Sequence, residues 1–473
     1  MPRSSTKIRF GTDGWRAAIA QEFTFSAVRR LAYGFAMYIR NDPSRENRAI
    51  VGYDRRFASE HFAAAAADMI AHEGIAVELS DRAIPTQLCS FMAQDRKCMA
   101  FVVTASHNEW LDNGIKIKDV TGAPAEDHIL RSIEALVPAR APITGVSDSG
   151  ISKYDMTKGY LDRVRGLVDI DRISSHFGKF VIDSMHGCAA GWLPMLVDHT
   201  RSFQFTEIRT ERNPYFGGVN PEPIMPHLEA LRRAVIESSA DGGLAFDGDA
   251  DRVGLITESG RFVNQLQVFA LLYLHLLADR DLRHPAVHTV TSTQMIPRIA
   301  RAFGTEAHET SVGFKYVGSK MREVGAVIGG EESGGFGYGF HIPERDGLLS
   351  ALLLLELRAM RGLGFDALLS ELQERFGPSE YNRVDVHYDR HAYVKVIGDT
   401  LKDIDERIGA ALHPLDVERV VTLPDNGVKA YLKGGSWLML RFSGTEPVLR
   451  IYAEGPSASN VADLLERGRG LAL

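Results

Sequence analysis

The stretch Leu244–Ile256, LAFDGDADRVGLI, places three carboxylates between two short apolar segments that are typical of β-strands. Asp247, Asp249 and Asp251 alternate along the chain, so in an extended conformation their side chains would point to the same side. Ionised carboxylates held together repel, and each raises the pKa of the others. A cation should therefore lie among them. Three charged oxygens that leave room for water and a phosphate suit Mg²⁺, and this pattern predicts a magnesium site.

Three other interpretations of this stretch are possible. A polar hairpin turn uses one or two Asp with Gly and seldom three in alternation. A calcium-binding helix-loop-helix needs Gly at its sixth position, where this chain has Arg252, and it needs helical rather than strand-like flanks. A phosphatase of the haloacid-dehalogenase type has Asp-x-Asp after a buried strand, with Asp247 as the nucleophile. That family has Thr or Val where Asp251 stands, so the match is loose, and this alternative stays open.

The composition is that of an ordinary globular protein, with 45% hydrophobic and 24% charged residues. A chain of 473 residues is too long for one core, and its length predicts several domains. The net charge of −7, with scattered Lys and Arg, favours neither a nucleic acid nor an acidic membrane as a partner. An odd number of cysteines (three) without metal-ligand spacing, and an N-terminus without an apolar segment, predict a reduced, cytoplasmic protein.

A strand–turn–helix pattern recurs three times, at 48–79, 178–199 and 287–310, and Ser59 is the predicted N-cap of the first helix. The segments 382–390 and 434–455 alternate like antiparallel strands, and a helix follows them. Glycine, serine and proline near 145–152 and 376–382 indicate linkers. The predicted fold class is α/β, with three similar mixed-sheet domains and a smaller C-terminal α+β domain around a central cleft. The expected ranges are 1–148, 149–258, 259–376 and 377–473.

Polar residues follow the predicted buried strand AFVV, at the end where ligands collect in open α/β sheets. Ser106 stands there beside His107, although a lone Ser-His pair is more often a local turn cap. Lys116 strengthens the case for chemistry, because a lysine whose pKa is lowered by burial can carry a proton. The nucleophile-elbow pattern Gly-x-Ser-x-Gly is missing around Ser106, which argues against acyl transfer.

Two further segments carry polar groups suited to a sugar phosphate. Glu331 and Ser333 lie among glycines in GGEESGG, where the backbone turns tightly or lets a ligand approach, and both can grip sugar hydroxyls. Nearby side chains that we also assign to substrate binding are Lys315, His341 and Arg345. The segment RFSGTEP combines Arg441 with backbone amides in a nest suited to a phosphate.

Five motifs together resemble the α-D-phosphohexomutase superfamily: FGTDGWRA, TASHN with NGIKI, FDGDADR, GGEESGG and RFSGTEPVLRIY. They occur in the family's order and cover the chain from about Arg9 to Glu454. The resemblance implies an isomerase of carbohydrate metabolism, a phosphoglucomutase or phosphomannomutase that moves a phosphate between O1 and O6 of a hexose. It implies that Ser106 is the phosphoserine, that Lys116 is a general base or acid, and that Arg16 and Arg252 line the reacting phosphate. The distal phosphate loop it implies consists of Arg441, Ser443, Gly444 and Thr445.

The resemblance also implies the cofactors and partners. Mg²⁺ would be held by Ser106 with the three aspartates, hexose 1,6-bisphosphate would be the activator and intermediate, and the chain would be a monomer or a homodimer. Two residues depart from the family pattern: Glu109 replaces the usual Pro after SHN, and Arg345 stands where glucose enzymes often have Lys. Gly335 replaces the His of the glucosamine and mannose branches, which favours glucose, then mannose, then glucosamine. A binding protein without turnover is the non-enzymatic alternative.

Overall fold

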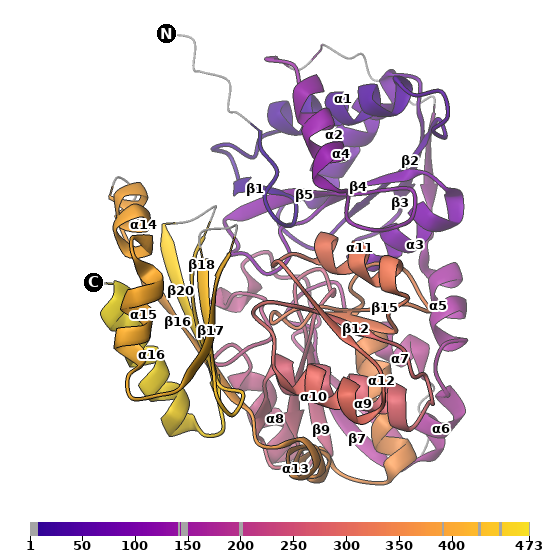
Figure 1. Ribbon diagram of the computed structural model, residues 1–473. Coiled ribbons are helices and arrows are strands. Elements are labelled where there is room, and N and C mark those ends of the chain that lie inside the picture. The colour runs from indigo at the N-terminus through magenta and orange to yellow at the C-terminus, as the bar shows by residue number, and fades with distance from the viewer. Residues whose placement is uncertain are drawn as a thin grey trace.

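Four β-sheets follow one another along the chain, each with its own helices (Figure 1). The computed structural model describes residues 8–140, 142, 150–197, 202–389, 392–423, 427–443 and 447–472. The first three sheets mix parallel and antiparallel pairs, and the fourth is antiparallel throughout. The predicted α/β class is therefore confirmed, with three mixed sheets followed by a C-terminal unit of a different kind.

The first unit has the strand order β1-β5-β4-β2-β3-β6. The Ala-rich segment forms a helix as predicted, but Ser59 is its first residue and Ala58, at φ 57°, precedes it, so the predicted N-cap was wrong. The Ser59 hydroxyl donates instead to Asp54 Oδ1 at 2.7 Å. The sheet also takes in β6, which lies beyond the expected boundary at 148. The elements are β1 (Trp15–Ala18), α1 (Phe25–Arg40), β2 (Arg48–Tyr53), α2 (Ser59–His72), β3 (Ala76–Ser80), α3 (Thr86–Arg96), β4 (Met99–Val103), β5 (Asp112–Lys118), α4 (Asp127–Leu136) and β6 (Ile151–Tyr154).

The second unit contains the two strands predicted around the aspartates. Its sheet has the order β11-β10-β9-β7-β8, and β9 pairs antiparallel with β10 so that Phe246 lies opposite Val253. Both strands are fully buried, which explains their unbroken apolar sequences. The elements are α5 (Thr157–Arg165), α6 (Ile170–Ser175), β7 (Gly178–Asp183), α7 (Trp192–Leu196), β8 (Phe203–Ile208), the 3₁₀ turn η1 (Phe216–Gly218), α8 (Glu229–Ser238), β9 (Gly242–Phe246), β10 (Val253–Thr257) and β11 (Phe262–Val263).

The third unit holds the two longest apolar segments of the chain as buried helices, α9 and α12. Their side chains join those of the second unit and of α3 in one core. Among the described residues, no helix is both long and apolar enough to cross a membrane. The elements are α9 (Gln265–Ala278), β12 (Ala286–Thr289), α10 (Met295–Ala302), β13 (Ala307–Thr310), α11 (Phe314–Val324), β14 (Ile328–Gly330), β15 (Phe336–Tyr338), α12 (Gly347–Arg361) and α13 (Phe365–Phe376).

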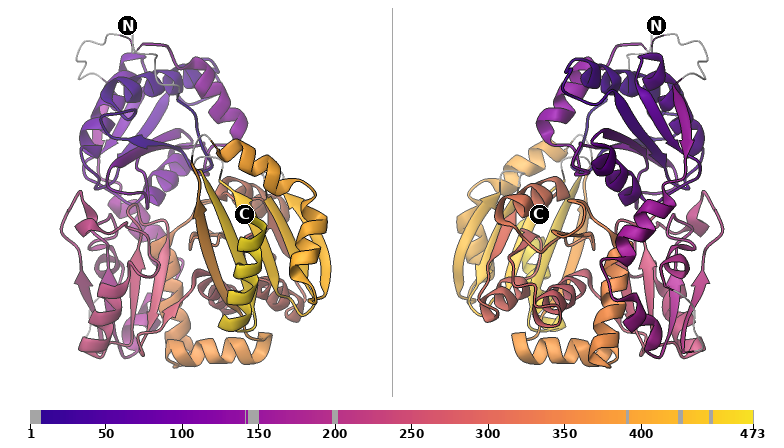
Figure 2. Two further views of the ribbon diagram at one scale, coloured as in Figure 1. Left: turned by 90° about the vertical axis from the view of Figure 1, so that its left-hand side faces the viewer. Right: turned by 90° about the vertical axis from the view of Figure 1, so that its right-hand side faces the viewer.

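The C-terminal unit is a five-stranded sheet with helices on its outer face (Figures 1 and 2). Alternate residues of β19 serve two cores: Leu438 and Leu440 pack in the unit's own core, whereas Trp437 and Met439 pack with Val290 of the third unit. Both faces of this strand are therefore covered. The elements are β16 (Glu380–His387), α14 (Tyr393–Leu401), α15 (Ile404–Leu412), β17 (Val417–Leu423), β18 (Gly427–Leu432), β19 (Trp437–Phe442), β20 (Val448–Gly455) and α16 (Ala458–Ala472).

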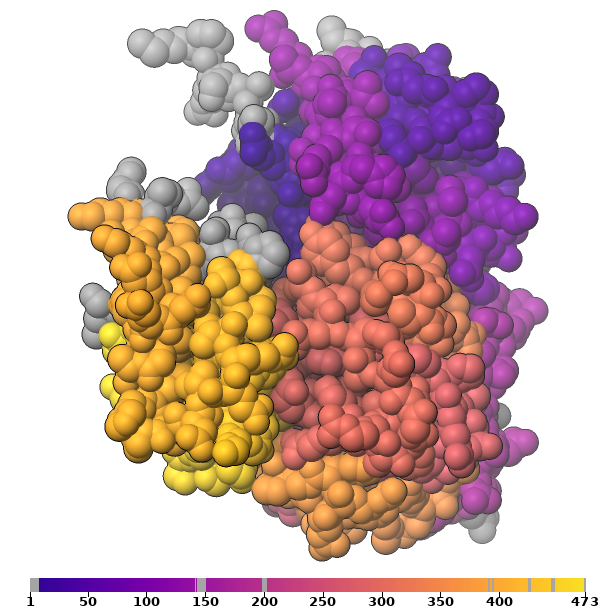
Figure 3. Space-filling model, in the orientation of Figure 1, coloured from indigo at the N-terminus to yellow at the C-terminus, as the bar shows by residue number. Residues whose placement is uncertain are grey.

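Buried polar contacts join the C-terminal unit to the third unit, which lies directly beside it (Figure 3). The Glu454 carboxylate accepts hydrogen bonds from the Thr293 hydroxyl, the Ser379 hydroxyl and the Trp437 indole. Lys429 donates to the carbonyl of Val290 at 2.5 Å. Ser379 belongs to the linker between α13 and β16. Glu454 of the C-terminal unit therefore binds both the linker and the third unit.

His288, on β12 near this junction, should make stability depend on pH. The imidazole is 2% exposed, and burial first and the Lys429 charge second lower its pKa to about 4. The unfolded chain therefore binds more protons than the folded one between about pH 6.5 and pH 4, and the free energy of unfolding decreases as the pH is lowered through that window. His288→Asn, which keeps a donor for the Thr289 carbonyl, should remove about 2 kcal/mol of the loss between pH 7 and pH 5.

Urea unfolding of the wild type and of His288→Asn at the two pH values would measure this difference. His308→Asn is the matched control, because His308 lies on the neighbouring strand β13 and is 25% exposed. Equal pH dependence in all three proteins would show that His288 does not contribute.

Candidate active site

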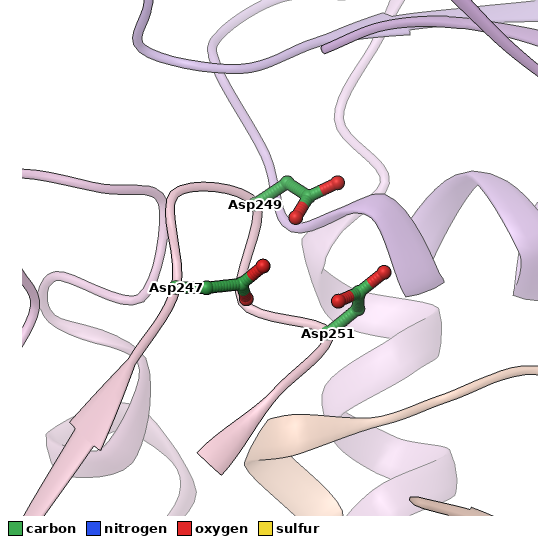
Figure 4. Close-up of side chains that lie close together, drawn as sticks. All are labelled: Asp247, Asp249 and Asp251. Carbon is green, nitrogen blue, oxygen red and sulfur yellow. The ribbon is translucent and has the colours of Figure 1, made fainter. Parts of the chain in front are cut away.

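The three aspartates lie on the loop between β9 and β10, and their carboxylates converge on one side of it (Figure 4). Their nearest oxygens all lie within 4.8 Å of one another, and the side chains of Asp247, Asp249 and Asp251 are at most 1% exposed. The loop is not extended as the alternation suggested, since Ala250 has φ 61°. The convergence predicted from the sequence is nevertheless present.

Cations from two other units neutralise part of this charge. Lys116 Nζ, from β5, lies 2.9 Å from both Asp249 Oδ2 and Asp251 Oδ2, and Arg345 Nη2 lies 2.9 Å from Asp251 Oδ2. Burial and then the two neighbouring carboxylates raise the pKa of Asp247 well above its usual range. At Asp249, burial acts in the same direction, but the charge and hydrogen bond of Lys116, together with a hydrogen bond with Asp247, outweigh burial and lower the pKa.

These pKa directions locate the repulsion within the cluster. The sequence assigned equal repulsion to all three carboxylates, but Lys116 stabilises the ionised form of Asp249, and the unfavourable charge lies on Asp247. Replacing Asp247, rather than Asp249, should therefore relieve repulsion in the free protein.

The donor set fits a hard divalent cation. Asp249 Oδ1 and Asp251 Oδ1 are buried and have no hydrogen-bond partner among the described residues. Buried acceptors without partners are uncommon, and they are expected where an ion completes the structure. Carboxylate oxygens without sulfur or nitrogen ligands favour Mg²⁺ over zinc or copper.

Ser106 faces this cluster from the loop that follows β4, as predicted from the strand-end rule. Its hydroxyl donates to Asp247 Oδ2 at 2.7 Å, and its amide donates to the Thr104 hydroxyl, which in turn donates to Asp249 Oδ2 at 3.2 Å. Ser106 has φ 52°, in the left-handed region that costs energy for a residue with a side chain. A strained, fully buried serine aimed at a carboxylate is more than a turn cap.

Lys116 differs from the proton carrier of lowered pKa that the sequence suggested. Burial lowers its pKa, but the carboxylates of Asp13, Asp249 and Asp251 outweigh burial and raise it. In this arrangement Lys116 is fully charged, so it can donate a proton more readily than it can accept one.

Asp13, which the sequence analysis did not single out, lies at the meeting point of three cations. Its carboxylate lies 3.0 Å from Arg16 Nη2, 3.1 Å from Lys116 Nζ and 2.9 Å from Arg345 Nη2. Burial opposes its ionisation, but Arg345, Lys116 and Arg16 together hold its pKa well below the usual range. Only its position three residues before Arg16 in FGTDGWRA hinted at this role.

Of the residues predicted in the third unit, Glu331 and Arg345 reach the cluster. Arg345 Nη1 lies 3.3 Å from Glu331 Oε2, and burial raises the pKa of Glu331. Ser333 is half-buried two residues further on. Arg252 lies 4.0 Å from Asp247 and 3.9 Å from Asp251, beside both carboxylates.

Other predicted residues have partners elsewhere. Lys315 Nζ lies 2.6 Å from Asp127 Oδ1 of the first unit, so it forms an ion pair between units. His341 was predicted to contact substrate, but its Nε2 lies 3.2 Å from Asp346 Oδ2, and Tyr160 donates to the same carboxylate. The structure places His341 in a buried junction between units, and its contact with substrate stays a prediction.

The predicted distal phosphate loop lies partly outside the described residues. Arg441 is on β19 opposite Arg450, and Ser443 follows the end of that strand, with its carbonyl accepting from the Tyr393 hydroxyl at 2.8 Å. Gly444 and Thr445 lie outside the described residues.

Comparison with known proteins assigns this constellation to a family. The models for phosphoglucomutase/phosphomannomutase match all along the chain: alpha/beta/alpha domain I at residues 7–143, domain II at 158–260, domain III at 264–376 and the C-terminal domain at 394–470. A relative assigned as a phosphoglucosamine mutase, from Methanothermobacter thermautotrophicus, is 32% identical over 98% of this chain and 97% of its own. The chain belongs to the phosphoglucomutase/phosphomannomutase family.

Further relatives agree with this membership. The phosphoglucomutase/phosphomannomutase of Thermococcus kodakarensis is 27% identical over 97% of both chains. The crystal structure of a Thermus thermophilus protein assigned as a phosphomannomutase superposes with a TM-score of 0.87, at 33% identity, over 99% of both chains. The chain is thus a phosphohexomutase, an isomerase of the α-D-phosphohexomutase superfamily. Its relatives carry different sugar names, so the comparisons identify the reaction class and not the hexose.

Proposed function

We propose that this phosphohexomutase interconverts glucose 1-phosphate and glucose 6-phosphate through a phosphoserine at Ser106 and a hexose 1,6-bisphosphate intermediate. Mannose phosphates are the second expected substrate and glucosamine phosphates the third. The observation that carries the proposal is the Ser106 hydroxyl, strained in φ and directed at Asp247 Oδ2 at 2.7 Å within a cluster of charged side chains.

The reaction we propose consists of two phosphoryl transfers. In the first, a sugar hydroxyl oxygen bonds to phosphorus as the bond from phosphorus to Ser106 Oγ breaks. Lys116 gives a proton to the leaving Oγ and takes up the proton that the sugar hydroxyl releases, so one proton passes from the sugar to Ser106. The bisphosphate then turns round, and its other phosphate returns to Ser106. Each transfer leaves charge on oxygens that Arg16, Lys116 and Arg252 can stabilise, and positioning with charge stabilisation supplies most of the catalysis in such reactions.

We assign the remaining residues from their environment. Lys116 is held in its charged form, so we assign it as the acid that protonates the leaving oxygen and as a source of positive charge. Mg²⁺ held by Asp247, Asp249, Asp251 and the oxygen on Ser106 would neutralise phosphoryl charge. Glu331 would accept hydrogen bonds from sugar hydroxyls, in an orientation set by Arg345.

A contact at Gly335 supports glucose ahead of the other sugars. A Cβ at this position would lie 2.3 Å from Cδ of Arg345, so a larger side chain would displace the arginine that orients Glu331. The His found here in the glucosamine and mannose branches is therefore incompatible with the Arg345 conformation of this chain.

A coupled assay of glucose, mannose and glucosamine 1-phosphates tests the order of preference. We expect kcat/KM to be highest for glucose 1-phosphate. A higher kcat/KM for glucosamine 1-phosphate would favour the second candidate, a phosphoglucosamine mutase, which the 32% identical relative supports. The phosphatase alternative uses Asp247 as the nucleophile, but that family has Thr or Val where this chain has Asp251.

Arg441 should hold whichever phosphate is not reacting, so its contact is expected in both orientations of the sugar. Arg441→Ala should raise KM for the 1-phosphate and the 6-phosphate alike, by roughly 10-fold to 100-fold, because one charge-assisted contact of about 1.5–3 kcal/mol is lost. Steady-state kinetics in both directions would measure this. Arg419→Ala, on strand β17 of the same sheet, is the matched control, and an unaltered KM in Arg441→Ala would contradict the assignment.

A further inference from the structure

The Arg56 side chain binds the loop that contains Ser106, and it contacts only backbone carbonyls of that loop. Its Nη2 donates to the carbonyls of Ser106 at 2.7 Å and Asn108 at 2.5 Å. Its Nη1 donates to the carbonyls of Glu109 at 2.7 Å and Asp112 at 3.0 Å. One guanidinium thus binds four carbonyls within seven residues, which a lysine ammonium with its compact charge cannot reproduce.

The arginine is itself fixed on both sides. Its side chain is completely buried, its Nε lies 3.4 Å from Asp54 Oδ2, and its guanidinium lies 4.9 Å from the ring centroid of Phe216 in the second unit. Asp54 Oδ1 accepts from the Arg56 amide and from the Ser59 hydroxyl. Arg56 therefore connects the end of β2 rigidly to the loop.

Of the four hydrogen bonds that Arg56 donates, the one to the Ser106 carbonyl is the most important, because Ser106 has a strained backbone conformation. Ser106 has φ 52°, and its carbonyl is also approached by Gly248 of the aspartate loop, where a Cβ would lie 2.5 Å from that oxygen. The peptide that follows Ser106 is thus enclosed between Arg56 and the aspartate loop. With this carbonyl fixed, the hydroxyl of Ser106 is directed toward Asp247.

The environment of Glu109 is consistent with a loop that Arg56 holds through its backbone. Glu109 replaces the proline that is usual in the family, and its side chain is exposed, whereas its carbonyl is bound by Arg56. A loop that lacks the fixed φ of proline has more backbone freedom, and the hydrogen bonds of Arg56 restrict that freedom.

We infer that Arg56 is a positioning residue that sets the left-handed conformation of Ser106 and so the direction of its Oγ, without touching substrate. The inference rests on the proposed function, in which Ser106 Oγ carries the phosphoryl group. A displacement of about 1 Å at a reacting atom can lower a rate by about 100-fold, so loss of Arg56 should reduce kcat and leave substrate affinity nearly unchanged.

The test compares Arg56→Lys and Arg56→Ala with the matched control Arg55→Ala. Arg55 is the neighbouring arginine and donates to a single carbonyl, Thr210, on the other side of the segment. We expect kcat in Arg56→Lys to fall about 100-fold, with KM for glucose 1-phosphate within about threefold of the wild type. Added guanidinium ion should restore part of the activity of Arg56→Ala and leave Arg55→Ala unchanged.

Amide hydrogen exchange of residues 104–112 provides a readout independent of catalysis. Exchange there should accelerate in Arg56→Lys and stay at the wild-type rate in Arg55→Ala. Wild-type kcat in Arg56→Lys, a rise in KM alone, or unchanged exchange in this segment would overturn the inference. If Arg56→Ala does not fold, Asp54→Asn, which loosens the arginine without removing it, should show the same fall in kcat, and normal kcat in it would count against the inference.

The controls keep this inference separate from the proposed function. If the wild type neither turns over hexose phosphates nor accepts phosphate on Ser106, the proposed function fails. Hydrogen exchange in the variants then still decides whether Arg56 fixes the loop. If the wild type is active and Arg56→Lys is equally active, only the inference about Arg56 fails.

Discussion

Ser106→Ala is expected to lower mutase kcat by at least about a thousandfold while leaving the fold intact. No other described hydroxyl donates to a carboxylate of the aspartate cluster except that of Thr104, which also binds the Ser106 amide. Alanine removes one hydrogen bond to Asp247 and the oxygen that would carry the phosphoryl group. The assay couples formation of glucose 6-phosphate to a dehydrogenase, with glucose 1,6-bisphosphate supplied.

Ser292→Ala is the matched control for this variant. Ser292 is a fully buried serine just beyond the end of β12 in the third unit, and its hydroxyl has no hydrogen-bond partner among the described residues. We expect this control to keep wild-type turnover. Near-normal activity in Ser106→Ala with the bisphosphate present would remove Ser106 from the mechanism.

Removal of divalent metal is expected to lower turnover by several hundredfold or more, and added Mg²⁺ should restore it, since a bound cation contributes several kcal/mol to charge stabilisation. Asp247→Asn should show the same loss because the donor set is incomplete. In the metal-free protein at neutral pH, however, this variant should be more stable by about 1 kcal/mol.

The sign of that stability change follows from the raised pKa of Asp247. A carboxyl whose pKa is higher in the folded state favours folding at low pH, and this contribution is lost as pH rises through the folded pKa. At neutral pH the folded protein therefore bears a penalty that Asn removes. Urea unfolding in chelator would measure it against Asp281→Asn, at an exposed carboxylate.

Opposite changes in activity and stability would distinguish a metal site from a structural turn. Full turnover in chelator would show that the metal assignment is wrong. Loss of stability in Asp247→Asn would show that the repulsion is compensated by partners other than a metal ion.

The sequence predicted those parts of the fold that depend on local pattern. The apolar segments around the aspartates are β9 and β10, and the long apolar segments are the buried helices α9 and α12. Ser106 lies beyond the carboxyl end of β4, where ligand groups collect in open α/β sheets, and beside the carboxylates. The division at 148, 258 and 376 remains a prediction, although β6 shows that the first sheet extends further.

Contacts between units could not be predicted from the sequence. Asp13 is an ordinary acidic residue until folding brings Lys116 and Arg345 against it from two other segments. Arg56 cannot be distinguished from its neighbour Arg55 in the sequence, since only burial beneath the Ser106 loop gives it four carbonyls to bind. For the same reason the sequence did not predict that His341 lies against Asp346.

The central claim is that Ser106 carries the phosphoryl group, and phosphopeptide mapping tests it most directly. The wild-type protein is incubated with glucose 1,6-bisphosphate and Mg²⁺, digested, and analysed by mass spectrometry, with Ser106→Ala in parallel. We expect one phosphate, on Ser106, that is lost when excess glucose 1-phosphate is added and is absent from the variant. Phosphate on Asp247 would indicate the phosphatase chemistry instead, and a protein that takes up no phosphate at either residue would contradict the account.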